Sequence, residues 1–343
     1  MKIRGLKLLF FFFGSILFMV LIRALSIGAD NIKNDFIRKL PSHLIFGIVA
    51  KDIGYNSWYF SGDNFKSIVL GNIVAPRKVL LVDTNFTHTN TINLTGFEGT
   101  EIYKGSSLIV DSGSIYLMDG LKPTIFKGLL SNMHLNQQIQ TPYFTSSVPT
   151  NDGLFVLRYI NSRQENVLAK TKDRLGRLQP TNLLEKQVDG VFCTDGVMIK
   201  VPGSQKMIYV YYYRNQFLCT DSNLNLLYKG KTIDTVSQAQ IKVEKITSTG
   251  ETTMSAPPFY VNKLASANSR HLFVQSALRA NNETGYMTKD VSMIDVYAIA
   301  DGKYQFSFYL PDFRGFKVRD FKVYGQSLYA LYDHYLYKYQ LNF

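Results

Sequence analysis

After residue 40 the chain is a succession of short β-rich runs separated by Gly, Asn, Asp and Ser, with almost no helical periodicity. Aromatic residues make up 14% of the sequence, and they favour strands because their side chains pack well on a pleated surface. Many short strands at regular intervals are typical of a sandwich, barrel or propeller, and they argue against a parallel α/β fold. We therefore expect an all-β domain.

Two short helices are the expected exceptions. Residues 30–39 offer a capping Asp30 or Asn31 and end before Pro41. Residues 181–187 offer Thr181 as a cap, with Glu185 near the position of a capping box.

A strand–turn–strand unit recurs along the chain. Ser114–Asp119 aligns without gaps with Gln216–Asp221, and related units begin at Lys78 and Ser292. Each has a further strand upstream, as the blade of a propeller does. The equivalent points of six copies are Asp83, Asp119, Ile160, Asp221, Tyr297 and Tyr339. Their spacing, 36 to 76 residues, predicts a β-propeller of about six blades with insertions after the third and fourth copies.

A pair of β-sandwiches is the alternative fold, because repeated hairpins alone can imitate blades. In the propeller, we expect a strand near residues 43–49 to close the ring by pairing with the last blade, which would remove the exposed edges.

The N-terminus resembles an export or anchoring signal. Lys2, Arg4 and Lys7 precede an uncharged apolar run at residues 8–22, which Arg23 closes. This pattern predicts a transmembrane signal-anchor at 1–28, a juxtamembrane segment at 29–42 and the propeller at 43–343. The basic end would stay in the cytoplasm, which places the propeller in the periplasm at the inner membrane. A cleaved signal and a secreted periplasmic protein is the alternative, since fifteen apolar residues are short for a span.

Charge bears on the partners. The formal net charge is +12, but residues 1–40 hold seven basic residues and two aspartates, which leaves +7 for the remainder. Those basic residues are scattered and form no stripe, so we expect no nucleic-acid binding. The expected partners are the membrane, through the N-terminal helix, and a membrane or periplasmic protein.

Two cysteines are present. Cys193 and Cys219 each lie in an apolar, strand-like run, which predicts two buried, reduced thiols on separate strands. A disulfide between them is the alternative in an oxidising compartment. The chain has no Cys-x-x-Cys motif, so nothing indicates thioredoxin-like chemistry.

Motifs that carry chemistry are missing from the sequence. It has no nucleophile elbow, no His-Glu-x-x-His, no P-loop and no paired Cys/His spacing, which predicts no catalytic residue, no metal and no cofactor. Two connections are long enough for recognition, which commonly lies on loops. Residues 183–196 supply the candidate binding residues Glu185, Asp189 and Asp195, and the polar insertion at 235–270 supplies Ser255 and Arg270. Tolerated surface excursions would explain both segments equally well.

These patterns favour a non-catalytic, membrane-anchored periplasmic binding or scaffold protein. The alternative is a propeller hydrolase or lyase with its site in the central channel. That alternative needs three or more ionisable side chains converging at one mouth of the ring, whereas an exposed patch on 235–270 favours binding.

Four segments resemble an uncharacterised Bacteroidota family of exported or membrane-anchored, β-propeller-like proteins: Tyr209–Phe217, Thr253–Pro258, Ser307–Asp312 and Ala330–Leu336. The resemblance covers most of residues 43–343. It implies export or anchoring and carries no established activity. Members of the family occur beside genes for MauE-like membrane proteins, which implies an accessory role in periplasmic thiol or maturation chemistry as a further alternative.

Overall fold

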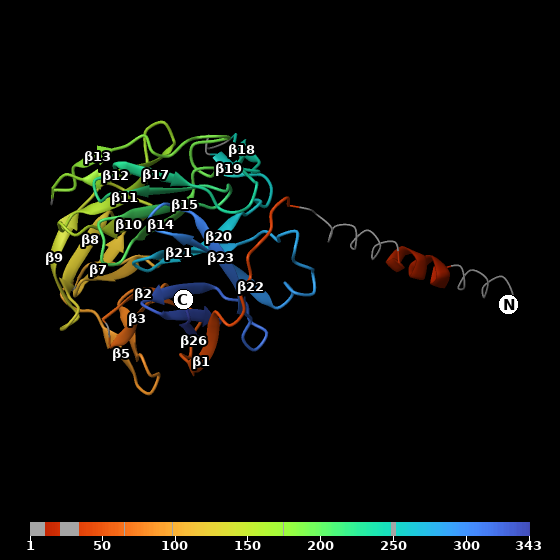
Figure 1. Ribbon diagram of the computed structural model, residues 1–343. Coiled ribbons are helices and arrows are strands. Elements are labelled where there is room, and N and C mark those ends of the chain that lie inside the picture. Colours follow the sequence, from red (N-terminus) through yellow and green to blue (C-terminus); the bar gives the residue numbers. More distant parts are fainter. Residues whose placement is uncertain (1–10, 21–33, 65, 98, 174, 248–251) are drawn as a thin grey trace, which may run out of the picture.

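The computed structural model describes residues 11–20, 34–64, 66–97, 99–173, 175–247 and 252–343 (Figure 1). Within these ranges the one helix spans residues 11–20. None of the described helical structure has the length and apolar content to cross a bilayer. The other parts of the predicted 1–28 anchor, residues 1–10 and 21–28, lie outside the described residues.

The domain is all-β, and most of its strands form six four-stranded antiparallel sheets, which are the blades of a propeller. Blade 1 contains β2 (Trp58–Asp63), β3 (Ser67–Asn72), β4 (Lys78–Asp83) and β5 (Thr89–Asn93). Blade 2 contains β6 (Ser107–Asp111), β7 (Ser114–Asp119), β8 (Thr124–Leu129) and β9 (His134–Gln140). Blade 3 contains β10 (Ser146–Pro149), β11 (Phe155–Ile160), β12 (Asn166–Thr171) and β13 (Leu178–Pro180).

The second half of the ring follows the same plan. Blade 4 contains β14 (Gly196–Lys200), β15 (Met207–Tyr211), β16 (Phe217–Thr220) and β17 (Leu226–Gly230). Blade 5 contains β20 (Asn262–Ala267), β21 (His271–Ser276), β22 (Val291–Ala298) and β23 (Tyr304–Pro311). Blade 6 contains β24 (Asp320–Tyr324), β25 (Ser327–Tyr332), β26 (Tyr335–Leu341) and, from the other end of the domain, β1 (Ile45–Asp52). A small hairpin, β18 (Val243–Lys245) and β19 (Thr252–Met254), lies between blades 4 and 5.

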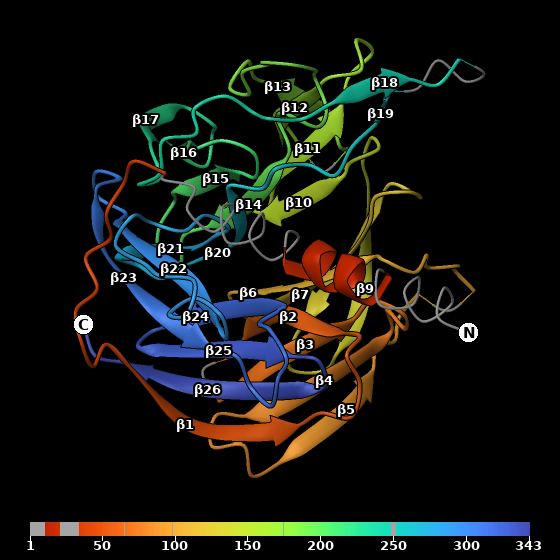
Figure 2. The same ribbon diagram turned by 90° about the vertical axis from the view of Figure 1, so that its right-hand side faces the viewer.

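The predicted closure of the ring is confirmed. β1 pairs antiparallel with β26, with Ile45 opposite Leu341 and Asp52 opposite Tyr335. Blade 6 is therefore assembled from both ends of the domain, and its outer strand comes from the N-terminal side (Figure 2).

The core is divided into six hydrophobic clusters, one between each pair of neighbouring blades. Both faces of each sheet are covered, so the inner strands have apolar residues in continuous runs instead of alternating apolar and polar ones. β15 is an example, because all five of its residues are buried. This pattern is what made the inner strands recognisable in the sequence.

The first strand of each blade along the chain is the one nearest the axis of the ring, and the six first strands run in the same direction (Figure 2). We call the face where they begin the entry face and the opposite one the exit face. Because the strands in each blade alternate in direction, every connection between blades lies on the entry face. The longest of these are residues 181–195 and 231–261, and the loop between β21 and β22 (277–290) lies on the same face.

Residues 34–44 form an extended strap on blade 5. Phe36 and Arg38 are buried while the residues between and beside them are exposed, an alternation that belongs to an extended chain and not to a helix. Phe36 packs with Val261 and Leu278, and the backbone of Ser307 in β23 donates a hydrogen bond to the Lys39 carbonyl at 2.8 Å. The predicted helix at 30–39 is therefore wrong over residues 34–39, and residues 30–33 lie outside the described part.

The predicted helix at 181–187 is also wrong. This segment has no regular secondary structure. Its Thr181 hydroxyl donates to the Leu168 carbonyl at 2.9 Å, and Leu183 and Leu184 pack on the cluster between blades 3 and 4. The tertiary contacts of Thr181, Leu183 and Leu184 therefore override the helical preference of this segment.

The blade count was correct although the alignment of the repeats was not. Asp119 and Ile160 end second strands, whereas Asp83 ends a third strand and Asp221 directly follows one. Successive hairpins of one blade look alike, so the alignment slipped by one strand in blades 2 and 3. The insertion predicted at 235–270 ends earlier, because residues 262–267 are the first strand of blade 5.

Candidate functional site

Three ionisable side chains meet on the entry face between blades 3 and 4. Arg158 of β11 forms an ion pair with Asp195 and donates hydrogen bonds to the Tyr209 hydroxyl at 2.9 Å and to the Gly196 carbonyl at 3.1 Å. The Tyr209 hydroxyl in turn donates to the Thr194 carbonyl at 2.7 Å. Arg158 therefore cross-links blades 3 and 4.

The protonation states in this cluster are fixed by burial and charge. Burial opposes the charge of Arg158, but Tyr209 and Asp195 outweigh it, so the pKa of Arg158 is raised. Burial also raises the pKa of Tyr209, and the nearby Arg158 only partly opposes that rise. At neutral pH the tyrosine therefore keeps its proton, which it donates in the hydrogen bond to the Thr194 carbonyl.

Asp189 holds the turn that precedes blade 4. Its carboxylate accepts three backbone N–H groups, from Val191 at 3.0 Å, Phe192 at 2.7 Å and Cys193 at 2.8 Å. The Cys193 thiol donates back to the Asp189 carbonyl at 2.7 Å. Hydrogen bonds to a carboxylate are about twice as strong as neutral ones, so this side chain is engaged in shaping the loop.

The other three candidate residues lie apart from this turn. Glu185 is exposed and forms an ion pair with Lys229 of β17. Ser255 is exposed next to β19, with its backbone N–H bonded to the Lys242 carbonyl at 3.0 Å. Arg270 is exposed in the turn between β20 and β21, on the exit face. The five candidates therefore do not form one site.

An ion pair inside the ring joins blades that are not neighbours. Lys200 of β14 in blade 4 contacts Asp111 of β6 in blade 2 at 2.7 Å. Blade 3 stands between them in the ring, so the two side chains meet near the axis, towards the exit face. The opposite charges neutralise each other there.

Aromatic side chains gather where the 231–261 connection returns to blade 5. The Tyr260 ring lies 5.0 Å from the Tyr213 ring and 6.0 Å from the Tyr212 ring, measured between centroids. Tyr260 is 40% exposed and its neighbour Phe259 is 41% exposed. We call Tyr212, Phe259 and Tyr260 the aromatic rim. Beneath the rim, Cys193 and Tyr213 form a small buried cluster with Ala239 and Ile241, against which Val243 of β18 and Met254 of β19 pack.

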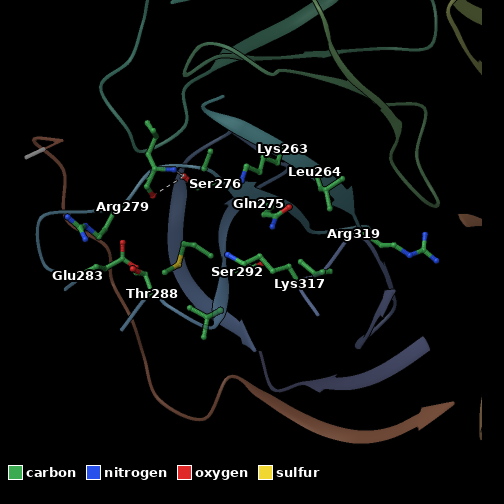
Figure 3. Close-up of a pocket in the computed structure, with 15 residues that line it drawn as sticks. Lys263, Leu264, Gln275, Ser276, Arg279, Glu283, Thr288, Ser292, Lys317 and Arg319 are labelled. Carbon is green, nitrogen blue, oxygen red and sulfur yellow. Dashed lines mark hydrogen bonds between the residues drawn. The ribbon is translucent and has the colours of Figure 1, made fainter. Parts of the chain in front are cut away.

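A cavity of about 430 Å³ opens between blades 5 and 6 on the entry face (Figure 3). Its charged lining residues are Lys263, Arg279, Glu283, Lys317 and Arg319. Figure 3 shows Lys263 and Lys317 reaching into it from opposite sides, whereas the Arg319 guanidinium points away. That guanidinium donates to the Asp333 carbonyl at 2.9 Å and to the Trp58 carbonyl at 2.7 Å.

Beside the cavity, the strap inserts Arg38 into a buried cluster of charges. Arg38 contacts Glu283 at 2.5 Å and Asp295 of β22 at 2.7 Å, and Asp295 also accepts a hydrogen bond from the Ser307 hydroxyl at 2.5 Å. Burial opposes the charge of Arg38, yet the two carboxylates outweigh it and its pKa is raised. Sequence reasoning missed this cluster. The available signal was Asp295, a charge in the middle of an otherwise apolar strand.

Both cysteines are free and buried, as predicted. Cys219 lies on β16, but Cys193 lies in a turn and not on a strand. Burial raises the pKa of the Cys219 thiol, so it stays protonated at neutral pH. In the described part of the chain, no group of three or more His, Cys, Asp or Glu side chains is placed to hold a metal ion.

Comparison with known proteins shows no matching family model and no match among curated proteins. Solved structures do resemble the chain, at 11% identity each. A DUF4221 family member from Bacteroides vulgatus has a TM-score of 0.49, covering 90% of this chain and 99% of its own. A Bacteroides fragilis protein whose name calls it exported also has a TM-score of 0.49, covering 92% and 97%. A catalytically inactive virginiamycin B lyase from Staphylococcus aureus, with quinupristin, has a TM-score of 0.48, covering 87% and 98%. TM-scores below 0.5 assign this chain no activity, ligand or partner, and its six-bladed architecture rests on its own sheets.

Proposed function

We propose that this chain is a non-catalytic binding or scaffold protein, held at the inner membrane by residues 1–28, with its partner docking on the entry face in the periplasm. The proposal includes membership of the Bacteroidota family of exported or anchored proteins that the sequence resembles. The basic, apolar and basic order of residues 2–23 supports the anchor. The strap supports the anchor too, because its contacts with blade 5 hold the end of the N-terminal segment firmly against the propeller.

One contrast on the entry face carries the proposal. The charged side chains of Arg158, Asp189 and Asp195 are occupied by one another or by backbone groups. The apolar side chains of Phe259 and Tyr260, by comparison, are exposed on an insertion that the ring does not require. Exposed aromatic groups on a rigid scaffold are typical of a protein-binding surface, where they bury a large area at little entropic cost.

Photo-crosslinking in living cells tests this partner surface. A benzophenone amino acid at position 259 or 260 of the full chain should give a crosslinked product of one discrete mass. The matched control is Leu175, which is 78% exposed in the turn between β12 and β13 on the exit face. Equal crosslinking from position 175, or none from 259 and 260, would contradict the proposal.

Membrane location needs a separate test. Because the native cysteines are buried, a Leu175→Cys variant supplies a single reactive thiol. In spheroplasts we expect a membrane-impermeant maleimide to label it without lysis, and the full chain to stay in the membrane pellet after carbonate extraction. Release of the chain by carbonate would leave the cleaved and secreted form. Labelling only after lysis would place the propeller in the cytoplasm.

The convergence of Arg158, Asp195 and Tyr209 favours the second candidate, a propeller hydrolase or lyase. If the cluster is structural, Asp195→Asn should lower the stability by about 1–3 kcal/mol and leave the crosslinking intact. Turnover of an ester or lactone panel that Asp195→Asn abolishes and Glu185→Gln retains would establish an enzyme instead.

A further inference from the structure

We propose that the cavity between blades 5 and 6 is a binding site for a small organic anion, with an apolar body and a phosphate or carboxylate group. This inference rests on the proposed binding function and deepens it by naming a class of ligand for the entry face. Its volume of about 430 Å³ falls in the range of small-molecule sites.

The cationic side chains of the cavity carry the argument. Lys263, Arg279 and Lys317 line it from three segments: the first strand of blade 5, the 277–290 loop and the connection to blade 6. None of the three forms an ion pair with a described residue, although eight other lysines and arginines of the described chain pair with aspartate or glutamate on mainly exposed or half-buried surfaces. Lys263 and Lys317, which both reach into the cavity, repel each other, and an anion between them relieves that repulsion.

The acidic side chains near the cavity do not cancel the positive potential that its lysines and arginine produce. Glu283 is the one acidic residue in the lining, and Arg38 already contacts it at 2.5 Å. Arg38 also pairs with Asp295, so the buried cluster keeps one excess negative charge, which is fewer than the positive charges of Lys263, Arg279 and Lys317. Asp312 lies outside the lining, and burial raises its pKa, with Lys317 only partly opposing that rise.

The rest of the wall defines the body of the ligand. Leu264, Val291, Met293 and Val318 supply apolar surface, while Gln275 and Ser292 supply groups that can donate hydrogen bonds. Figure 3 shows Gln275 on the same side as Lys263 and facing Lys317 across the cavity. An inorganic ion would leave the apolar part of this wall uncovered, so the fit is to an anion that carries a hydrocarbon or aromatic portion.

Calorimetric titration of the full chain in detergent tests the site with three probes. Phenyl phosphate combines ring and anion, inorganic phosphate is the anion alone, and benzyl alcohol is the ring alone. We expect saturable binding that is tightest for phenyl phosphate, weaker for inorganic phosphate and absent for benzyl alcohol. The affinity should fall with added salt, because the cations are reached by solvent.

Variants locate the binding. Lys263→Ala and Lys317→Ala should each weaken the binding of phenyl phosphate about threefold to tenfold, the range for the net contribution of one solvent-exposed polar contact. Lys317→Glu should abolish it, and Lys317→Arg should retain it. Lys104→Ala is the matched control, since it removes the same charge from an exposed entry-face position in a different blade. Unchanged melting temperatures would show that each variant folds.

Three results would overturn the site. These are no saturable binding of either phosphate, equal weakening by Lys104→Ala, and tighter binding of benzyl alcohol than of phenyl phosphate. Equal affinity for the two phosphates would remove the apolar body from the proposal. Each result is independent of crosslinking at positions 259 and 260, so failure of the anion site and failure of the partner surface are distinguishable.

Discussion

Two arginines in the described part of the chain are almost fully buried, and their surroundings differ. Arg38 in the strap is 2% exposed and lies between the carboxylates of Glu283 and Asp295. Arg214, in the turn between β15 and β16, is 1% exposed and forms no ion pair with a described residue. Its guanidinium carbon lies 3.7 Å from the centre of the Tyr211 ring, and its Nη1 donates to the Glu185 carbonyl at 2.9 Å.

The difference separates two ways of burying a charge. Around Arg38 the cost of removing each charge from water is offset by opposite charges, so the three groups depend on one another. Around Arg214 a π-system and a carbonyl offset only part of that cost, since Nε and Nη2 have no hydrogen-bond partner among the described residues. Removing Arg38 leaves two carboxylates buried, whereas removing Arg214 leaves no buried charge behind. The two sites should therefore respond very differently to the same substitution.

The largest effect is expected at the strap. Arg38→Met should lower the free energy of unfolding by about 3–5 kcal/mol, because two buried carboxylates lose their cation. Urea denaturation of the full chain in detergent measures this.

Two further variants qualify that result. Ile37→Ala, at the exposed neighbouring position, should change stability by less than about 0.5 kcal/mol. Adding Glu283→Gln and Asp295→Asn to Arg38→Met should restore part of the loss, since the orphaned charges are then gone. If Arg38→Met behaved like Ile37→Ala, the ion pairs of Arg38 would contribute nothing to the stability of the fold.

The same substitution at the second arginine should have a smaller effect. Arg214→Met replaces a buried, incompletely bonded cation with an apolar side chain of similar length, so stability should change by no more than about 1 kcal/mol in either direction. A loss as large as that of Arg38→Met would show that Arg214 has a strong partner and that the contrast between the two sites is false.

The smallest effect is expected at His271, because a histidine side chain can lose its charge near neutral pH whereas an arginine cannot. His271 packs against Phe273 and Phe343, and burial, followed by the charge of Arg270, lowers its pKa. A lowered pKa means that the neutral form is favoured on folding. The contribution to stability is therefore complete above the ordinary histidine pKa of about 6.5 and is lost as the pH falls through the lower, folded value.

Melting curves between pH 7.5 and 5 should show this loss in the native chain and less of it in His271→Phe. The difference should stay below about 1 kcal/mol, because the ring is only half-buried. Identical pH profiles would mean that His271 titrates as it does in the unfolded chain.

The sequence predicts the strands whose residues are all buried, and it fails to predict strands that are largely exposed to water. β15 was recognisable because each of its residues is apolar and buried, and the adjacent strand β16 is fully buried as well. β9 was missed, since an outer strand with the sequence HLNQQIQ faces water along much of its length and has no pattern of its own. Such strands form because the adjacent strand has unpaired backbone N–H and C=O groups, and the sequence of the outer strand itself gives no sign of them.

The candidate site shows the same limit. The sequence identifies ionisable residues on a long connection, namely Glu185, Asp189 and Asp195, but it does not reveal their partners. Those partners, such as Arg158 for Asp195, come from a different blade. Lys263, Arg279 and Lys317 are separated along the chain and meet only because the ring brings blades 5 and 6 together. Single cations on a strand, a loop and a connection between blades carry no signal of a shared cavity.

The shared sixth blade has a consequence for how the chain acquires its structure during synthesis. β1 is made early, yet its partner β26 follows about 300 residues later, a sequence separation that makes this contact slow to form. Blades 1 to 5 consist of consecutive hairpins that can assemble in order as they emerge. β1 must meanwhile wait as an unpaired strand. The window between the synthesis of residue 52 and that of residue 341 is therefore the period in which the chain is most exposed to wrong pairings, and full protection from proteases should arrive in one step, with the last seven residues of blade 6.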